Sequence, residues 1–360
     1  MSTMNPTTLP EVKTLFAQRL SQARRMRGLS LRALSDKMDP AVSYNALHKY
    51  EAGVMLPDSA VLRSMAATLG QSVDFFFRPI TVTLESIEFR KKSKLGAKQI
   101  DAIREEATDF FERYLQVEKA LGLDTEFNNP IAHLSIKRPD EIEEASTALR
   151  KAWELGMAPL GNVVELLEHH QIKVQLQKAD SSFDGFAGRS GKIPVIVLNK
   201  VFPADRIRLT ALHELGHLLL TFDRSVDEKM KEKLCHRFAG SMLIPRAVFE
   251  NEFGHSRAHV TLVELTDMKA EYGISIAAIM ARALDLGLIT IGMYTQFCIL
   301  RNRKHWNSHE PGVYSGKESS NRFDQLLHRA VATEVISLSL ASSLAKIPLA
   351  EFRESVQLIP

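Results

Sequence analysis

The chain has 360 residues, of which 45% are hydrophobic and 25% charged, a composition typical of globular proteins with room for two or three domains. It contains no run approaching the roughly 18 uninterrupted apolar residues of a membrane span, and its first residues, MSTMNPTTLPEV, lack the apolar core of a signal peptide. Two cysteines cannot form a disulfide framework, which agrees with a reducing compartment. We therefore exclude a membrane-spanning or disulfide-stabilised secreted protein and expect a cytoplasmic one.

The positive charge of the chain is concentrated near its N-terminus. The formal net charge is only +3, but residues 13–78 carry ten Lys and Arg against five acidic residues, which leaves a net charge of −2 on the rest. Such asymmetry indicates that one end contacts a polyanion while the other end has a different task.

Short helical patterns follow one another through residues 13–80. Ser30, Ser43 and Asp58 each stand where a side-chain oxygen can cap the free amides of a helix. Five short helices, the first of them basic, are typical of a helix-turn-helix DNA-binding domain. The alternative that stays open is a helical protein-binding domain with a solvated basic face. The predicted helices span residues 14–26, 30–38, 43–51, 58–69 and 73–77.

The sequences LSQARRMRGLSLRALSDKM and SYNALHKYEAG, continued by LPDSAVLRSMAATLGQS, resemble the Xre-type helix-turn-helix of phage repressors. The resemblance implies that the helix at residues 43–51 enters the major groove of an operator, with Leu47 and Tyr50 packed inward. Two-fold operators also imply binding as a homodimer. The side chains expected to contact base edges are those of Ser43, Tyr44, Asn45 and His48. The side chains expected to contact phosphates, and so to set affinity and salt dependence, are those of Arg24, Arg25, Arg32 and Lys49.

Residues 81–138 are predicted to connect two domains. The segment ITVTLESIEF alternates apolar and polar residues as a short strand does, and a basic patch follows it. Apolar residues then recur at helical spacing through residues 97–121, and we expect this long helix to cover the domain that follows. A further helix is predicted at residues 140–154. The basic patch comprises Arg90, Lys91, Lys92, Lys94 and Lys98.

Residues 159–200 combine helical and strand patterns. A helix is predicted at residues 159–170, and a strand at KVQLQ, residues 173–177. The run FDGFAGRSGKIPVIVLNK is predicted to form a turn-linked pair of strands, with residues 195–198 the most buried.

The stretch LTALHELGHLLL, residues 209–220, holds His213, Glu214 and His217 in an HExxH arrangement. On a helix the two histidines share one face, so both can offer a ring nitrogen to one metal ion. Zinc suits such ligands and lowers the pKa of its bound water to about 7, so that Glu214 can act as a general base. Gly216 lies between the histidines, and a glycine costs a helix about 1 kcal/mol relative to alanine, which predicts that another group approaches the helix closely there.

A third ligand is expected on a second helix, predicted at residues 227–243. Our choice is Glu232, 15 residues beyond His217. Asp223 is disfavoured because it is too close in sequence to turn back onto the same metal, whereas spacing leaves Asp227, Glu228 and His236 open.

The runs DRIRLTALHELGHLLL and EKLCHRFAGSMLIP together resemble the zinc-peptidase domain of the ImmA/IrrE family. In that family the carboxylate that opens the second motif is the third ligand, which implies Glu232 here. Where the family usually has alanine followed by asparagine, this chain has Cys235 and His236. The resemblance also implies that related peptidases cut repressors of their own operon type, and that fused forms act as antitoxin-like autoregulators beside a toxin gene.

Three other features complete the sequence-based interpretation. Residues 194–199 are expected to present a strand edge to an extended peptide, because zinc peptidases hold substrate along the HExxH helix. His255 and His259 are four apart but lie in a predicted loop, so a metal role is disfavoured for them. Two helices are predicted within residues 260–289, and more helix within 322–359.

The predicted fold class is therefore mainly α with a small β-sheet, combining a five-helix N-terminal helix-turn-helix domain with an α+β, zincin-like HExxH domain. The predicted division is a flexible tail at residues 1–12, the DNA-binding domain at 13–80, a connector at 81–138, the metallopeptidase domain at 139–290 and a helical tail at 291–360.

Two functional hypotheses follow from these patterns. The first is a transcription regulator that carries a zinc-dependent hydrolase, autoregulates its operon, and cleaves itself or a partner regulator. The second is an antitoxin-like repressor whose peptidase fold grips a partner such as a toxin without cutting it.

Overall fold

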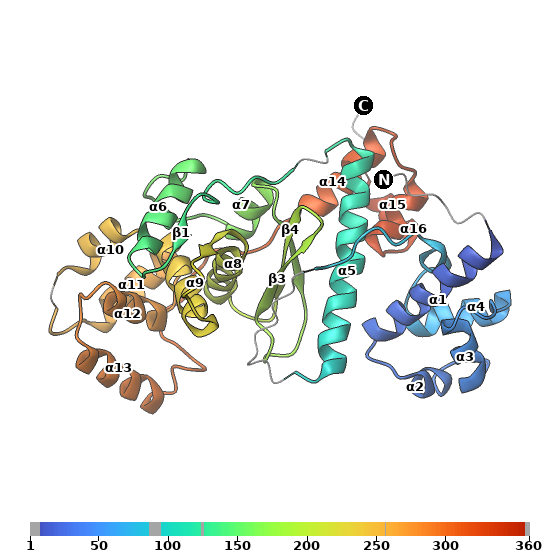
Figure 1. The fold of residues 1–360 in the computed structure, drawn as a ribbon, viewed down its shortest axis with the longest axis horizontal. Helices are drawn as coiled ribbons and strands as arrows, with labels where there is room; N and C mark the ends of the chain where they lie inside the picture. Colours follow the sequence, from blue (N-terminus) through green and yellow to red (C-terminus); the bar gives the residue numbers. More distant parts are fainter. Residues whose placement is uncertain (1–7, 86–94, 124–125, 256, 357–360) are drawn as a thin grey trace. The chain divides into compact units, whose positions relative to one another are not determined.

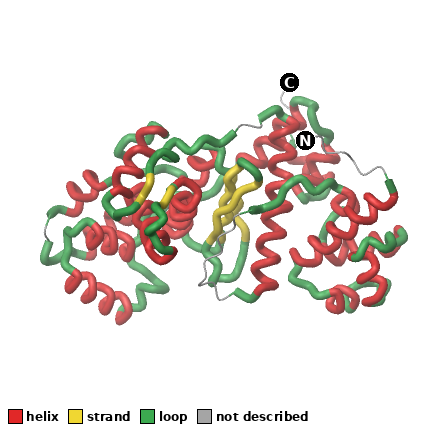
Figure 2. Tube along the Cα trace, viewed as in Figure 1, coloured by secondary structure: helices red, strands yellow, loops and turns green. Residues whose placement is uncertain are grey.

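The computed structural model describes residues 8–85, 95–123, 126–255 and 257–356 (Figure 1). The described chain is mainly helical with a few short strands (Figure 2), as the sequence predicted. Its contacts divide it into two compact units. Unit 1 contains residues 8–85, 95–123 and 321–356, and unit 2 contains the described residues from 126 to 320.

The N-terminal part of unit 1 is a bundle of short helices. Ser30, Ser43 and Asp58 cap the second, third and fourth of them, each side chain accepting a backbone N–H three residues further on. The first helix begins five residues before its predicted start, because Thr8 and Glu11 form a reciprocal capping box. The helices are α1 (Leu9–Met26), α2 (Leu31–Ser35), α3 (Tyr44–Glu51), α4 (Ser59–Leu69) and the 3₁₀-helix η1 (Val73–Phe77).

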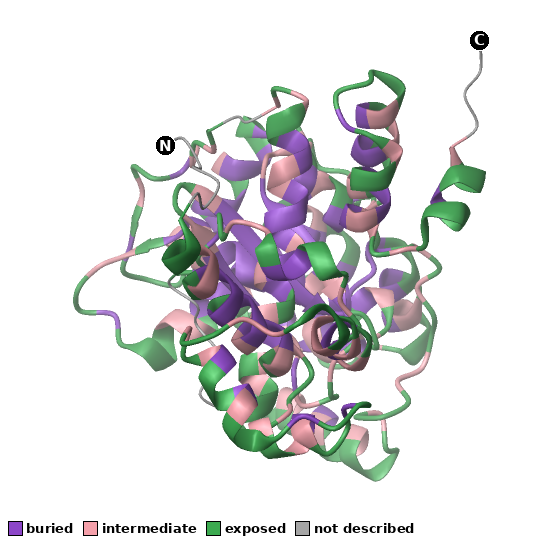
Figure 3. Cartoon of the chain, turned by 90° about the vertical axis from the view of Figure 1, so that its right-hand side faces the viewer, coloured by how far each residue is buried: buried purple, intermediate pink, exposed green. Residues whose placement is uncertain are grey.

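The core of this bundle is built from one apolar face of each helix. Phe16 and Leu20 of α1 are fully buried, and they lie in one cluster with Leu47, Met65 and Phe76 from the other helices. Most helices of the chain have one buried and one exposed face (Figure 3), the pattern from which they were predicted.

The long helix α5 (Ala97–Ala120) matches its predicted span and belongs to unit 1. Its buried side chains Tyr114 and Val117 pack with Leu327, Leu344 and Phe352 of the C-terminal helices, which belong to unit 1. The C-terminal helices are α14 (Arg322–Ala332), α15 (Leu338–Ala345) and α16 (Leu349–Ser355). The helix therefore completes the core of unit 1, and the expectation that it also covers the domain that follows stays a prediction.

Buried charges also tie α5 into unit 1. The guanidinium of Arg19 on α1 donates to Glu112 of α5 at 2.7 Å. Asp109, also on α5, pairs with Arg113 at 3.0 Å and with Lys346 at 2.6 Å. Three segments that are far apart in sequence are thus joined by ion pairs as well as by apolar packing.

Only part of the strand predicted before α5 lies in the described chain. Residues 80–84 form a loop, Glu85 makes a single β-bridge, and residues 86–89 lie outside the described part of the chain, so the prediction stays open there. The same holds for Arg90, Lys91, Lys92 and Lys94 of the basic patch, whereas Lys98 is exposed on the first turn of α5.

Unit 2 places helices around a small sheet. Its helices are α6 (Glu141–Ala152), α7 (Val163–His169), α8 (Ala204–Leu219), α9 (Glu228–Leu243), α10 (Arg246–Phe253), α11 (Leu262–Tyr272), α12 (Ile276–Asp285) and α13 (Ile291–Arg303). Its strands are β1 (Ser135–Ile136), β2 (Lys173–Gln177), β3 (Gly185–Ser190), β4 (Ile193–Asn199) and β5 (Thr221–Phe222). The pair β1–β5 is parallel and only two residues long, and no sequence pattern predicted it.

The three-stranded sheet has the order β2-β4-β3, with β2 parallel and β3 antiparallel to β4. Gly191, with φ at 57°, turns the chain between β3 and β4. Residues 195–198 are fully buried, as predicted. The prediction that residues 194–199 present an edge was wrong, because β4 is hydrogen-bonded to β2 on one side and to β3 on the other; β3 packs beside α8.

The helix that carries the HExxH motif lies in the middle of unit 2. Leu212, Leu215 and Leu219 of α8 are buried, and α8 contacts β3, β4, α7 and most extensively α9. Within the described ranges, no helix is both long and apolar enough to cross a membrane.

Candidate metal centre and DNA-binding surface

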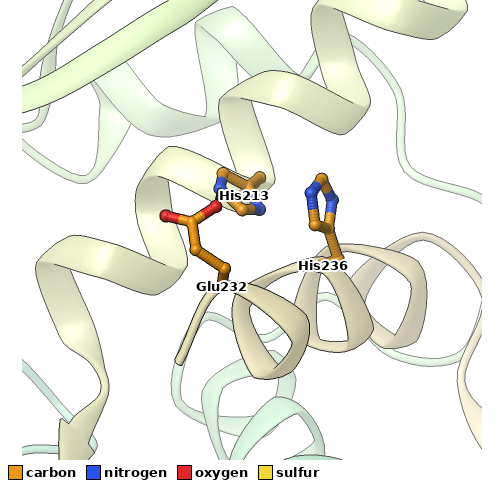
Figure 4. Close-up of side chains that lie close together, drawn as sticks. All are labelled: His213, Glu232 and His236. Atoms are coloured by element: carbon orange, nitrogen blue, oxygen red, sulfur yellow. Dashed lines mark ion pairs between the residues drawn. The ribbon is translucent and has the colours of Figure 1, made fainter. Parts of the chain in front are cut away.

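Two adjacent helices carry the predicted metal-binding side chains. His213, Glu214 and His217 lie on α8, and Glu232 lies on the second turn of α9, whose start is fixed by the cap of Asp227 on the Met230 amide. Figure 4 shows Glu232 reaching from α9 towards His213.

The donor atoms of three of these residues converge. The Nε2 atoms of His213 and His217 are 3.0 Å apart. Oε1 of Glu232 lies 3.3 Å from Nε2 of His217, and Oε2 lies 3.6 Å from Nε2 of His213. Zinc bonds of 2.0–2.1 Å in a tetrahedron separate two ligand atoms by about 3.3 Å. The three distances bracket that value, so the residues fit a zinc ion.

The electrostatics of the site favour a positive charge between the two helices. Burial lowers the pKa of His217, but its hydrogen bonds to Cys235 and Glu232 and the nearby charge of Glu214 outweigh burial and raise that pKa to about 11. A cluster of groups that stabilises a cation so strongly is the electrostatic environment that a divalent metal ion requires.

Gly216 allows α8 and α9 to approach each other at the site. A Cβ atom added there would lie 3.3 Å from both Cβ and Sγ of Cys235, a fully buried residue of α9. This confirms the expectation of a close approach at Gly216. The sequence did not reveal that Cys235 is the residue that contacts Gly216, nor that the Cys235 thiol forms a hydrogen bond with His217.

The site is buried on the α8 side and open on the α9 side. The side chain of His213 is 1% exposed and that of His217 is 11% exposed, whereas Glu232 is 40% exposed. Glu214 is buried next to His213. A ligand could therefore reach the donor atoms past Glu232, while Glu214 is shielded from bulk water.

Most of the alternative third ligands have other partners. Asp223 accepts hydrogen bonds from Ser225 at 2.9 and 2.6 Å, and Glu228 pairs with Lys231 at 2.7 Å. Asp227 caps α9. Glu232 is the candidate whose carboxylate lies close to both histidines, and the His236 ring lies against that of His213. The role of Glu232 as the third ligand stays a prediction.

The other histidine pair that the sequence singled out is in a loop. His255 and His259 follow the end of α10 and are exposed, as predicted for side chains outside a helical metal site. Within the described ranges, His213 and Glu232 also group with His236, one donor atom of each lying within 4.8 Å of the others, whereas the ion-pair distances group them with His217.

The predicted base-contacting residues are exposed at the start of α3. Ser43 caps this helix with its Oγ, and Tyr44, Asn45 and His48 are exposed, while Leu47 and Tyr50 are buried as expected. This is the orientation that insertion into a major groove requires.

The four predicted phosphate contacts differ in their surroundings. Arg24 donates to both carboxylate oxygens of Glu51, at 2.6 and 2.9 Å, and so joins α1 to the end of α3. Arg25 is half exposed and pairs with Glu105 of α5 at 3.4 Å. Arg32 and Lys49 are exposed. The geometry gives Arg24 a structural role and leaves the other three side chains able to approach a phosphate.

These two sites are typical of regulators that combine a helix-turn-helix DNA-binding domain with a metallopeptidase-like domain. Comparison with known families agrees with both parts. A helix-turn-helix family model matches residues 20–76, and the model of the IrrE N-terminal-like domain matches residues 167–284. The chain therefore joins an Xre-type helix-turn-helix domain to an ImmA/IrrE-like domain, as the motifs predicted. No curated protein matches the chain.

Proposed function

We propose that this chain is a DNA-binding transcription regulator whose unit 2 is a zinc-dependent metallopeptidase. His213, His217 and Glu232 would hold the ion, and Glu214 would be the general base. The observation that carries the proposal is the convergence of three residues from two helices, whose donor atoms lie 3.0 to 3.6 Å apart.

The chemistry assigned to unit 2 is peptide hydrolysis. Zinc, when bound, supplies a Lewis acid that polarises a peptide carbonyl and acidifies water. Glu214, shielded from bulk solvent, would take the proton of the attacking water and pass it to the leaving amine. An extended substrate would lie along α8, beside the sheet strand β3 that packs against this helix.

The arrangement of the chain bears on what is cut. Unit 1 is assembled from segments on both sides of unit 2. A single cut within residues 126–320 would leave α1 to α5 packed against α14 to α16, so self-cleavage there would not by itself release the DNA-binding domain. This favours a partner regulator as the substrate, with autoregulation of the operon through unit 1.

The test compares cells that express the wild-type chain with cells that express Glu214→Ala, each with the neighbouring gene, by mass spectrometry of protein fragments. Fragments seen only with Glu214 intact would support proteolysis and identify the cut site. Because Glu214 is not a ligand, zinc content should be equal in the two proteins, which excludes metal loss as the cause. Identical fragment sets under stress and at rest would contradict the peptidase role.

A second candidate function is a repressor of a toxin–antitoxin operon, in which unit 2 binds the partner without proteolysis. It is favoured by the replacement of the usual alanine and asparagine by Cys235 and His236 beside the metal centre. Under this alternative, Glu214→Ala keeps full repression and full partner binding. Under the first proposal, derepression in response to a signal is lost in the same variant.

A further inference from the structure

Each of the two helices at the metal centre carries a pair of metal-binding residues four positions apart. On α8 the pair is His213 and His217, and on α9 it is Glu232 and His236. Side chains four apart on a helix lie on one face. Two facing pairs therefore supply four protein donors, which is the number that fills a tetrahedral zinc site.

His236 lies close enough to take part. Its ring centroid is 4.1 Å from that of His213, with the rings tilted by 40°. One donor atom each of His213, Glu232 and His236 lie within 4.8 Å of one another (Figure 4). The backbone of α9 is fixed immediately before His236, because Cys235 packs against Gly216.

The movement needed for coordination is small. A tetrahedral zinc site separates its donor atoms by about 3.3 Å, so His236 would have to approach the donor atoms of His213 and Glu232 by at most about 1.5 Å. His236 is exposed, so rotation of its side chain is not opposed by surrounding core residues. A neutral imidazole is also among the best zinc ligands available in a protein.

We propose that His236 is a fourth, displaceable protein ligand of the metal ion. It would occupy the coordination position that a catalytic zinc site leaves open, and an incoming peptide carbonyl or water would have to displace it. The step is an exchange of one neutral ligand for another, with no covalent bond made or broken in the protein. The inference rests on zinc binding at the proposed centre and adds a closed resting form to it.

The test counts imidazole ligands by zinc K-edge X-ray absorption spectroscopy of the full-length protein. Three imidazoles and one carboxylate are expected for the wild type, and two imidazoles for His236→Asn. The matched control is His259→Asn, which removes an exposed histidine of the same unit and should leave three. Asparagine is the residue that the ImmA/IrrE family usually has at this position, so His236→Asn should fold. Circular dichroism checks that it does.

Two solution measurements give independent readouts. Zinc affinity, measured by competition with a chromophoric chelator, should fall about tenfold or more in His236→Asn and stay unchanged in His259→Asn. Acetohydroxamate, added to cobalt-substituted protein, should bind more tightly to His236→Asn than to the wild type, because no internal ligand has to leave. Equal hydroxamate binding by the two proteins would contradict displacement.

The results separate this inference from the proposed function. A wild-type protein that binds one zinc ion through two imidazoles would overturn the role of His236 and leave the metallopeptidase proposal intact. A wild-type protein that binds no zinc would overturn both.

Discussion

Gly216 lies where α8 meets Cys235 of α9, and this contact determines what a substitution there would do. Exchange of a helical glycine for alanine normally stabilises by about 1 kcal/mol. Here the new methyl group would lie 3.3 Å from a fully buried residue, and overpacking costs about 1–3 kcal/mol. We expect Gly216→Ala to lower the free energy of unfolding of the metal-free protein, measured by urea denaturation.

Gly161→Ala is the control for this prediction, because a methyl group there meets no atom within 4 Å. It should leave the stability unchanged or raise it slightly. A Gly216→Ala variant as stable as Gly161→Ala would show that α9 can move away from α8, and that the crossing does not hold the metal-binding residues in place.

Substitution of Arg24 should change mainly the stability of the protein, and substitution of Lys49 mainly its binding to DNA. Arg24→Ala would leave the Glu51 carboxylate, 13% exposed, without its two charged hydrogen bonds, at a cost of about 2 kcal/mol in unfolding free energy. Lys49→Ala should change stability by less than about 0.5 kcal/mol. It should weaken binding to a mixed-sequence duplex and lower the salt slope by about 1, measured by fluorescence anisotropy.

If Arg24→Ala weakened DNA binding and left the unfolding free energy unchanged, Arg24 would contact DNA and would not stabilise the helix bundle.

Arg24 also shows what a single sequence could not reveal. A basic helix predicts phosphate contacts, but which of its arginines turn inward depends on partners such as Glu51, which lies 27 residues away. By contrast, the inward side of α3 followed from its apolar spacing alone, and Leu47 and Tyr50 are buried as predicted.

At the scale of elements, the first backbone amides of helix α7 donate to a buried carboxylate. Glu318 accepts the backbone N–H groups of Val163 at 2.8 Å and Val164 at 3.2 Å, with Arg208 3.5 Å away. Burial raises the pKa of Glu318 to about 7, because it outweighs the lowering by Arg208 and the two amides. A carboxyl whose pKa is raised on folding stabilises the fold at low pH, and that contribution is lost as pH rises from about 4.5 to about 7.

The stability of Glu318→Gln should therefore depend less on pH than that of the wild type. The difference in unfolding free energy, variant minus wild type, should increase by roughly 2.5 kcal/mol between pH 5 and pH 8. Urea denaturation at the two pH values measures it. Glu144→Gln, an exposed change on α6 of the same unit, is the control and should show little increase. A difference that is constant with pH would mean that Glu318 is ionised throughout.

The elements that were predicted well are those whose signal is local. Caps and apolar spacing placed α3, α4, α5 and α9 within a residue or two, and alternation placed β2. What failed was the position of elements relative to one another. The sequence of β4 is equally compatible with an edge or a central strand, because burial on both faces says nothing about which strands pair with it.

At the metal centre too, the local pattern was predictable from the sequence and the relation between the two helices was not. The HExxH spacing fixes two histidines on one face of a helix whatever surrounds it. Glu232 required a second helix to return to the first, and only the two-motif resemblance favoured it over the nearby acids. The contact of His236 with His213 depends on the angle at which α8 and α9 cross, which no local pattern encodes.

At the scale of the whole molecule, metal binding should stabilise only one of the two units. Both tryptophans, Trp153 and Trp306, belong to unit 2, so their fluorescence reports on its unfolding alone, whereas circular dichroism reports on both units. Zinc at about 1,000 times its dissociation constant adds about 4 kcal/mol to the unit that binds it. Removing zinc with a chelator should shift the fluorescence transition, which reports on unit 2, to lower urea concentration. The transition that is seen only by circular dichroism, which reports on unit 1, should stay unchanged. Two transitions that move together would show that the units unfold as one.

The division of unit 1 between both ends of the sequence has a consequence for synthesis on the ribosome. Tyr114 and Val117 of α5 are made early, but their partners Leu327, Leu344 and Phe352 follow only after the whole of unit 2. The bundle around Phe16 and Leu20 is local and can form at once. During elongation the apolar face of α5 stays uncovered for some two hundred residues, and unit 2 can fold in that interval. A nascent chain that stalls before α14 would expose this face to chaperones and proteases.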